Sequence, residues 1–563
     1  MPASLIVRNA RVYTVDPGRP WAQAVAVERE RIAWVGSNAE AAARTGPGTE
    51  VIDARGATVM PGFIDSHNHV RLGSNPLEVD LAGASTLEEV KARVRAHADA
   101  HPEQDWIEGV GFNYSAMPGG RMPVWQDLDG LTGGRPAFVL TYDAHNAWLN
   151  REAMERFGID RETDALAWGH VRKDPRSGEP TGIVGDFAVM GISRAGQRAL
   201  EGVLPGYERA LQYERTLESI DAATAFGITT IVEPQNSPDD MWIFERARAE
   251  GQLRSRLVAA MFHPVGTTDA ERDEFDAMRA RYDDDRLRVG PIKLYIDDVI
   301  EPWTAAMLEP YANRPGERGE TFWSPGEFAE LVIELERRGW SCHVHGTGDR
   351  GLRVALDGFD AARRANGDVG ARHGMVHTEC LHADDVPRFG ALGVTPIMQP
   401  RHCAPEIVAD WRANVGEARW RHAWAFRSLR DAGATLAFSS DWNVAEMDPM
   451  VGIYTAITRA NLDGSDPWIP EETVDLETAI RAYTMGGAHV VFADDRRGSV
   501  TVGTQADLVV LSDDLFAAAD DRHVGRRREE LARVLERHDV AREQREVGTQ
   551  ARRDRAAVLL EEV

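Results

Sequence analysis

Two histidines follow a short apolar stretch in a spacing that suits a metal ion. The strand predicted over residues 59–64 is followed at once by DSHNH, which contains His67 and His69. Residues two apart on a strand point to the same face, so both imidazoles can aim at one ion from the strand's C-terminal end. The pair alone is weak evidence, because two unrelated polar residues at a strand end look the same.

Further residues of ligand type recur at the ends of other predicted strands. The segment SCHVHGTGD contains His345 nearest its C-terminal end, GMVH ends at His377, and Asp441 follows TLAFSS. We expect His345 to be the ligand of its segment and His343 to be a neighbour or a structural residue. Each of these residues alone is more often structural. A set at the C-terminal ends of successive strands is typical of a barrel active site.

Lys293 lies within the apolar strand predicted in GPIKLYIDD. A buried, unpaired ammonium group is energetically expensive, so the side chain needs a partner or a modification. One explanation is a salt bridge to Asp297 or Asp298. The other is carbamylation by CO₂, which converts the cation into an anionic bridge between two metal ions. The sequence leaves both explanations open.

This residue set predicts hydrolysis by a metal-activated water. Several histidines and one carboxylate without ligand-spaced cysteines suit Zn²⁺, with Mn²⁺ or Fe²⁺ as alternatives. A bound divalent ion lowers the pKa of water to ~7, which supplies hydroxide at neutral pH. We expect Asp441 to accept the proton from that water and to deliver it to the leaving nitrogen.

A second set of residues is expected to contact the substrate. We expect His145 to act in catalysis by polarising the scissile carbonyl group. For the histidines the alternative is ordinary hydrogen bonding, and for the tryptophans it is core packing. If several aromatic rings line the site, we expect the substrate to be a small, partly apolar or aromatic amide. The predicted substrate-contacting residues are His145, Trp303, Arg401, His402 and Trp442, with Trp125 as a further aromatic candidate.

Alternating strands and helices must position these residues. Six apolar strands after residue 220, together with the strand before His67, indicate a parallel sheet covered by helices. We therefore predict an α/β fold with a (β/α)₈ TIM-like barrel over residues 61–489. Residues 76–200 are less regular and rich in Pro, Gly and Trp, which indicates an insertion that shapes the mouth of the site.

The two ends of the chain resemble each other in their strand patterns. Residues 1–60 contain short strands separated by turn residues, and residues 490–515 are predicted to add two more strands around Val502, so the ends can complete one sheet domain. Residues 516–563 form a tail crowded with Arg and Glu. This tail is predicted to be a solvated helix or a disordered segment.

Composition excludes several classes of partner. The 563 residues carry a formal net charge of -26, which disfavours nucleic acid and anionic membrane surfaces. Three cysteines cannot form a disulfide framework, and no stretch approaches the ~18 apolar residues of a spanning helix. We expect a cytoplasmic enzyme acting on a small molecule, and we leave a homodimer open.

Several motifs together resemble those of the amidohydrolase superfamily, in the YtcJ-like branch that includes N-substituted formamide deformylases. They run from about residue 5 to about residue 515 in the family's order, and they are PGFIDSHNHV, IKLYIDD, HVHGTGDRG, the strand ending at His377, QPRH, FSSDWNV and GSVTVGTQADLVVL. The chain departs from relatives in the MVHTE segment and at Asp297-Asp298.

The resemblance implies a binuclear zinc centre beside a composite β-sandwich built from residues 1–60 and 490–515. Its implied ligands are the first-strand pair His67 and His69, a bridging carbamylated Lys293, His345, His377 and the last-strand acid Asp441. Three other functions remain open. They are a mononuclear deaminase on the same fold, a cyclic amide or ester hydrolase, and a non-catalytic scaffold.

Overall fold

Eight parallel strands form the central sheet of the computed structural model, which describes residues 3–73 and 77–519. Each strand pairs with the next along the chain, and Ser66 N at the end of the first donates to Phe438 O of the last (3.4 Å), so the sheet is a nearly closed barrel. The predicted (β/α)₈ barrel is confirmed. Its strands are β8 (Phe63–Asp65), β16 (Ile228–Asn236), β17 (Arg256–Phe262), β18 (Leu287–Tyr295), β19 (Cys342–Gly346), β20 (Gly374–His377), β21 (Thr395–Met398) and β22 (Ala437–Phe438).

Strand β17 is the one barrel strand that the sequence pattern did not predict. Its residues RLVAAMF are buried at every position, so no alternation of polar and apolar side chains marks it as a strand. A short, fully apolar run cannot be told from a buried helix segment by periodicity. Pairing with β16 and β18 on either side decides its structure.

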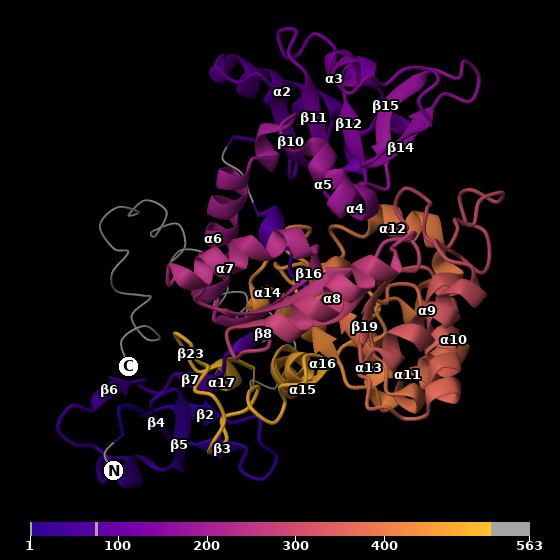
Figure 1. Cartoon of the computed structure of the whole chain (residues 1–563). Helices are drawn as coiled ribbons and strands as arrows, with labels where there is room; N and C mark the ends of the chain where they lie inside the picture. The colour runs from indigo at the N-terminus through magenta and orange to yellow at the C-terminus, as the bar shows by residue number, and fades with distance from the viewer. Residues whose placement is uncertain (1–2, 74–76, 520–563) are drawn as a thin grey trace.

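Helices follow the strands and cover the outside of the barrel (Figure 1). Local sequence starts several of them: Ser324 and Thr268 each form a capping box with the glutamate three residues on. Among the described residues, no helix is long and apolar enough to cross a membrane. The covering helices are α6 (Arg209–Ala225), α7 (Met241–Ala249), α8 (Asp269–Arg281), α9 (Pro325–Arg337), α10 (Asp349–Asn366), α11 (Val386–Leu392), α13 (Phe426–Asp431), α14 (Pro449–Thr458) and α15 (Leu476–Arg481).

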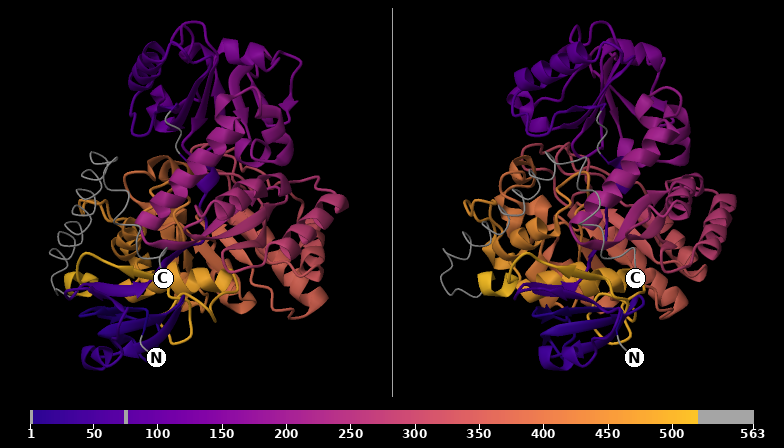
Figure 2. Two further views of the ribbon diagram at one scale, coloured as in Figure 1. Left: turned by 60° about the vertical axis from the view of Figure 1, so that its left-hand side comes forward. Right: turned by 90° about the vertical axis from the view of Figure 1, so that its left-hand side faces the viewer.

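Both ends of the described chain contribute to a pair of four-stranded sheets beside the barrel (Figures 1 and 2). Strand β23 (Leu508–Val510) pairs antiparallel with β7 (Thr58–Pro61), so the C-terminal segment completes an N-terminal sheet. Two strands were predicted around Val502, and among the described residues there the structure contains one, β23. The remaining strands are β1 (Leu5–Arg8), β2 (Arg11–Tyr13), β3 (Trp21–Ala22), β4 (Ala24–Glu28), β5 (Arg31–Gly36) and β6 (Glu50–Asp53).

The predicted charged tail is described only at its beginning. Residues Leu515–Ala519 form the short helix α17, where Phe516 packs against Tyr13 and Trp21 with ring centroids 4.9 and 4.6 Å apart. The prediction for the tail from residue 520 onward lies outside the described residues.

Residues between β8 and α6 form a separate seven-stranded sheet rather than an irregular elaboration (Figure 1). Short strands and Gly- and Pro-rich turns hid this sheet in the sequence, yet it has its own apolar core around Trp148. Gln235 Nε2 of the barrel donates to Ala188 O (2.8 Å) and ties this insert to the rim. Its elements are β9 (Val79–Asp80), α2 (Leu87–Ala100), β10 (Ile107–Phe112), β11 (Ala137–Thr141), β12 (Ala147–Leu149), α3 (Arg151–Arg156), β13 (Ala165–Leu166), β14 (Gly169–Lys173), β15 (Pro180–Gly185), α4 (Phe187–Met190) and α5 (Arg194–Leu200).

A buried carboxyl group lies where the insert meets the barrel. Glu108 of β10 is only 7% exposed, and its Oε1 accepts a hydrogen bond from Gly206 N (2.9 Å), just before α6. Burial, together with the charge of Glu78, raises the pKa of Glu108 to about 7. Because an unfolded glutamate ionises near pH 4.5, the folded protein binds this proton more tightly than the unfolded chain.

Glu108 is therefore expected to make stability fall as the pH rises. Its contribution is fully present below about pH 4.5 and is lost through about pH 7, on the order of 3 kcal/mol. Glu108→Gln should remove this dependence, so its urea midpoint should exceed that of the unmodified protein more at about pH 8 than at about pH 5. Glu155→Gln, at an exposed position on α3, is the control. Equal pH dependence in all three proteins would refute the assignment.

Candidate metal centre

The carboxylate of Asp65 holds the first and last barrel strands together at the rim. Its Oδ1 accepts from Ser440 N (3.0 Å) and His67 N (3.4 Å), and its Oδ2 accepts from Ser440 Oγ (2.6 Å) and Asn68 Nδ2 (2.9 Å). Asp441 N also donates to His67 O (2.9 Å). These bonds fix the DSHNH segment against the loop that carries Asp441.

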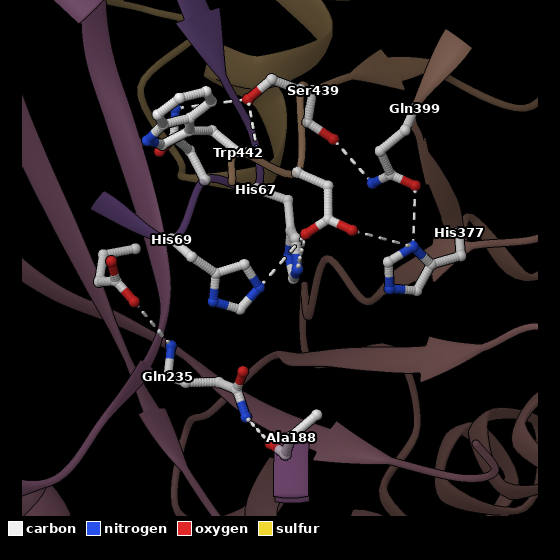
Figure 3. Close-up of polar contacts among 12 residues, drawn as sticks. His67, His69, Ala188, Gln235, His377, Gln399, Ser439 and Trp442 are labelled. Atoms are coloured by element: carbon white, nitrogen blue, oxygen red, sulfur yellow. Dashed lines mark hydrogen bonds and ion pairs between the residues drawn. The ribbon is translucent and has the colours of Figure 1, made fainter. Parts of the chain in front are cut away.

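His67, His69 and Asp441 form a buried donor group at this rim. Figure 3 shows the two histidines of the group. Asp441 Oδ1 lies 3.4 Å from His67 Nε2 and 3.2 Å from His69 Nε2. Donor atoms bound ~2.1 Å from a tetrahedral ion stand roughly 3.4 Å apart. Asp441 Oδ1 is buried and has no hydrogen-bond partner among the described residues. The three side chains therefore fit a divalent metal ion.

Lys293 of β18 is fully buried beside this donor group. Its Nζ lies 3.4 Å from His67 Nε2 and 4.7 Å from the ring centroid of Tyr295. Burial lowers the pKa of Lys293 to about 7, so a large share of the amine is neutral at physiological pH. His343, which we expected as a neighbour of the site, lies beside Lys293 on the adjacent strand in direct register.

The salt bridge proposed as one explanation for Lys293 is wrong. Asp297 instead accepts backbone hydrogen bonds from Thr347 (3.0 Å), Gly348 (2.9 Å) and Ala306 (2.9 Å). Asp298 forms its ion pair with His145. Both acids follow the strand rather than facing the barrel interior beside Lys293. Within the described parts of the chain, Lys293 has no ion pair.

His345 and His377 each have one ring nitrogen held by a neighbour. His345 Nε2 lies 3.3 Å from Asp298 O, and its Nδ1 is buried with no hydrogen-bond partner among the described residues. Gln399 donates from Nε2 to Ser439 Oγ (2.9 Å), so its Oε1 accepts from His377 Nδ1 (2.9 Å; Figure 3). Outer contacts of this kind orient histidines that bind metals. They leave His345 Nδ1 and His377 Nε2 available to bind a metal ion.

Asp441 is held in its ionised form. Burial alone would raise its pKa, but the close contact with His69 and the charges of the surrounding imidazoles hold it at about 2. The residue also adopts a left-handed backbone conformation (φ 56°), which is uncommon outside glycine and often occurs at functional sites. Asp441 is therefore an anion at neutral pH.

A pocket of about 420 Å³ opens beside these residues at the rim. Four of the predicted substrate-contacting residues line it, namely His145, Arg401, His402 and Trp442. Trp303 is not among the described residues of its wall. Its ring packs under Arg314, 3.5 Å from the guanidinium carbon, and its Nε1 donates to Asn313 Oδ1 (3.0 Å). Trp125 lies in the insert, where Arg151 stacks on its ring at 4.0 Å.

The insert brings His145 to the pocket. Asp143 Oδ1 accepts from His145 N (3.0 Å) and fixes the loop after β11, and the imidazole pairs with Asp298 of the barrel. Burial would lower the pKa of His145, but the Asp298 carboxylate raises it to about 9. The imidazole is therefore a cationic donor at neutral pH.

Several pocket residues were not predicted as site residues. Burial raises the pKa of Glu301 to about 7 and, together with the charge of Glu301, raises that of Glu379 well above its usual value. Glu379 follows His377 by two residues, the same spacing as His67 and His69, and this spacing was the available signal. No local pattern marks other residues of the lining, among them Tyr142, Asp143, Glu301 and Trp424.

Comparison with known proteins decides the family. The model of the Amidohydrolase family matches residues 50–535, most of the chain. The chain belongs to the amidohydrolase family. This amidohydrolase is 28% identical to the protein LONG AFTER FAR-RED 3 of Arabidopsis thaliana, over 91% of this chain and 87% of that protein. It is also 28% identical to the N-substituted formamide deformylase of Arthrobacter pascens, over 91% and 93% of the two chains.

A solved structure shares the arrangement of the amidohydrolase. An uncharacterized metal-dependent hydrolase from Pyrococcus furiosus superposes with a TM-score of 0.68 at 25% identity, covering 91% of this chain and 99% of that one. The predicted resemblance is therefore confirmed. Family membership makes the protein a hydrolase that acts on carbon–nitrogen bonds.

Proposed function

We propose that this amidohydrolase uses a binuclear metal centre to hydrolyse the C–N bond of a small amide or formamide. The observation that carries the proposal is the buried group of His67, His69 and Asp441 with Lys293 Nζ 3.4 Å from His67 Nε2. The similarity to an N-substituted formamide deformylase supports the substrate class.

Six residues are proposed to hold two ions, preferably Zn²⁺, at the barrel rim. A divalent ion bound there supplies Lewis acidity and lowers the pKa of water to ~7. The neutral amine of Lys293 is proposed to attack CO₂ and to lose one proton, which leaves an N-carboxylate that can bridge two cations. The proposed ligands are His67, His69, Lys293, His345, His377 and Asp441.

Two side chains are proposed to move charge and protons during hydrolysis. Asp441, an anion, accepts a proton from water and later transfers it to the leaving nitrogen. His145, a cation paired with Asp298, donates a hydrogen bond to the scissile carbonyl oxygen as negative charge develops there. Asp441 therefore acts on the water and the leaving nitrogen, and His145 acts on the carbonyl oxygen.

The pocket supports a small and partly apolar substrate. Its volume of about 420 Å³ lies at the lower end of the ~300–1,000 Å³ found for small-molecule sites. Trp442 and Trp424 contribute aromatic surface to the wall, whereas Arg401 and His402 offer polar contacts. We therefore propose aryl or alkyl amides and formamides as substrates.

The placement of Lys293 favours this function over a mononuclear deaminase. A mononuclear centre keeps the histidines and the aspartate but needs no lysine, whereas here the amine lies against a ligand histidine. We also propose a cytoplasmic location, because the three cysteines are free buried thiols, as expected in a reducing compartment.

A substrate panel tests the proposal. With the zinc-loaded protein, N-substituted formamides and aryl amides are expected to be hydrolysed, because a single compact pocket bounds the reacting centre. Peptides and oligosaccharides should be turned over at least ~100-fold more slowly, because one pocket cannot bury an extended chain. Activity confined to peptides or sugars would refute the substrate class. Deamination of a heterocycle without amide hydrolysis would instead support the mononuclear function.

A further inference from the structure

The two oxygens of the Asp441 carboxylate face two different donor groups. Oδ1 lies against His67 and His69, as described above. Oδ2 lies 3.8 Å from His377 Nδ1, the nitrogen that donates to Gln399, and 3.7 Å from His402 Nε2. His402 comes from the rim segment after β21 and is not among the six proposed ligands.

Glu379 completes a second group on the Oδ2 side. Its Oε1 lies 4.0 Å from His402 Nδ1, and the donor atoms of His377, Glu379 and His402 all lie within 4.8 Å of one another. These separations approach the roughly 3.4 Å between donors around a tetrahedral ion. Two imidazole nitrogens and one carboxylate oxygen are a frequent donor set for zinc.

A neighbouring side chain holds Glu379, and His402 keeps an unpaired nitrogen. Trp411 Nε1 donates to Glu379 Oε2 (3.0 Å) and leaves Oε1 free to face His402. His402 Nε2 is buried and has no hydrogen-bond partner among the described residues. His377 and Thr378 both adopt left-handed backbone conformations (φ 72° and 53°), which turn the chain sharply between His377 and Glu379.

The charge of the pocket wall favours a cation at this position. Glu379 lies on the same wall as Glu301 and Asp143. The cation nearest in sequence to His402, Arg401, is already engaged by Glu446 (2.8 Å) and Glu406 (2.6 Å). Buried carboxylates without a compensating cation are unfavourable. The two imidazoles favour a transition metal ion over an ammonium group. A transition metal ion binds the lone pairs of the imidazole nitrogens directly, whereas an ammonium group can only donate a hydrogen bond to them.

We infer that Glu379 and His402 are metal ligands, which with His377 hold an ion on the Oδ2 side of Asp441. This inference rests on the proposed metal-dependent function. It adds Glu379 and His402 to the six ligands proposed for the two ions, on the basis of the contacts described above.

The zinc content of variants tests the inference. After saturation with Zn²⁺ and removal of free metal, Glu379→Gln and His402→Gln should each contain one ion per chain fewer than the unmodified protein. Glu301→Gln removes a partly buried carboxylate that lines the same pocket outside the donor group, and it should keep the full content. With Co²⁺ in place of Zn²⁺, the visible absorption should change in the first two variants only. Full metal content and unchanged Co²⁺ spectra in both variants would overturn the inference.

A measurement on the unmodified protein covers the case in which the variants misfold. Crystals soaked in Zn²⁺ should show anomalous density within ~2.2 Å of Glu379 Oε1 and of a nitrogen of His402. Density confined to the His67 and His69 side would overturn the inference while the proposed function stands. Absence of zinc from the whole rim would overturn the proposed function as well.

Discussion

Asp441→Asn is expected to lower kcat by ~10³-fold while the metal content stays that of the unmodified protein. The amide keeps the size of the side chain and one oxygen donor, but it cannot accept and return a proton. In the structure Asp441 is the carboxylate shared by His67 and His69, and its pKa of about 2 keeps it ionised across the working pH range. Steady-state kinetics on a formamide substrate, with elemental analysis of the same sample, measures both quantities.

The control for Asp441→Asn is a buried aspartate that belongs neither to the donor groups nor to the pocket lining. Asp385 pairs with Arg353 (2.8 Å) and Arg388 (2.9 Å) beside helix α11, so Asp385→Asn should lower stability and leave kcat within ~3-fold. An Asp441→Asn enzyme that retains its metal and more than about a tenth of its kcat would show that another group transfers the proton.

Lys293→Ala is expected to remove at least one metal ion per chain and to abolish measurable hydrolysis. Lys293 is the residue proposed to bridge two ions after carbamylation, and its Nζ touches the ligand His67. The variant also leaves a small cavity, which should cost about 1–3 kcal/mol but should not unfold the barrel. Metal analysis and a thermal melt of the variant distinguish loss of metal from loss of fold.

The chain offers a matched control because it contains only three lysines, Lys91, Lys173 and Lys293. Lys173 forms a surface ion pair with Asp164 (2.5 Å) in the insert, so Lys173→Ala should keep full metal content and rate. A ¹³C-carbonate label should give a carbamate signal that Lys293→Ala lacks and Lys173→Ala retains. Unchanged metal content in Lys293→Ala would instead favour a mononuclear centre.

The sequence predicted the barrel because seven of its strands end in polar residues that interrupt an apolar run. Strand β17 lacks such an ending, and only its neighbours β16 and β18 reveal it. The insert was the larger error. Its strands are two to six residues long, and β12 pairs with both β11 and β15, so its order depends on contacts that no local pattern contains.

Residues at strand ends were predictable, because the ends of parallel strands meet at one rim. His67, His69, His345, His377 and Asp441 were predicted in this way, and the structure brings them together. The ion pair of His145 with Asp298 joins the insert to the barrel across more than 150 residues, so the sequence could not reveal it. Trp303 was predicted to contact the substrate but packs on Arg314. An aromatic residue near a barrel loop can do either, and the sequence does not distinguish the two.

The most direct test of the account is zinc content measured together with amide hydrolysis on the unmodified protein. We predict about two ions per chain, loss of hydrolysis when a chelator removes them, and recovery when Zn²⁺ is returned. Hydrolysis that persists in a protein shown to contain no metal would contradict the account, because the donor group of His67, His69 and Asp441 would then have no part in the reaction.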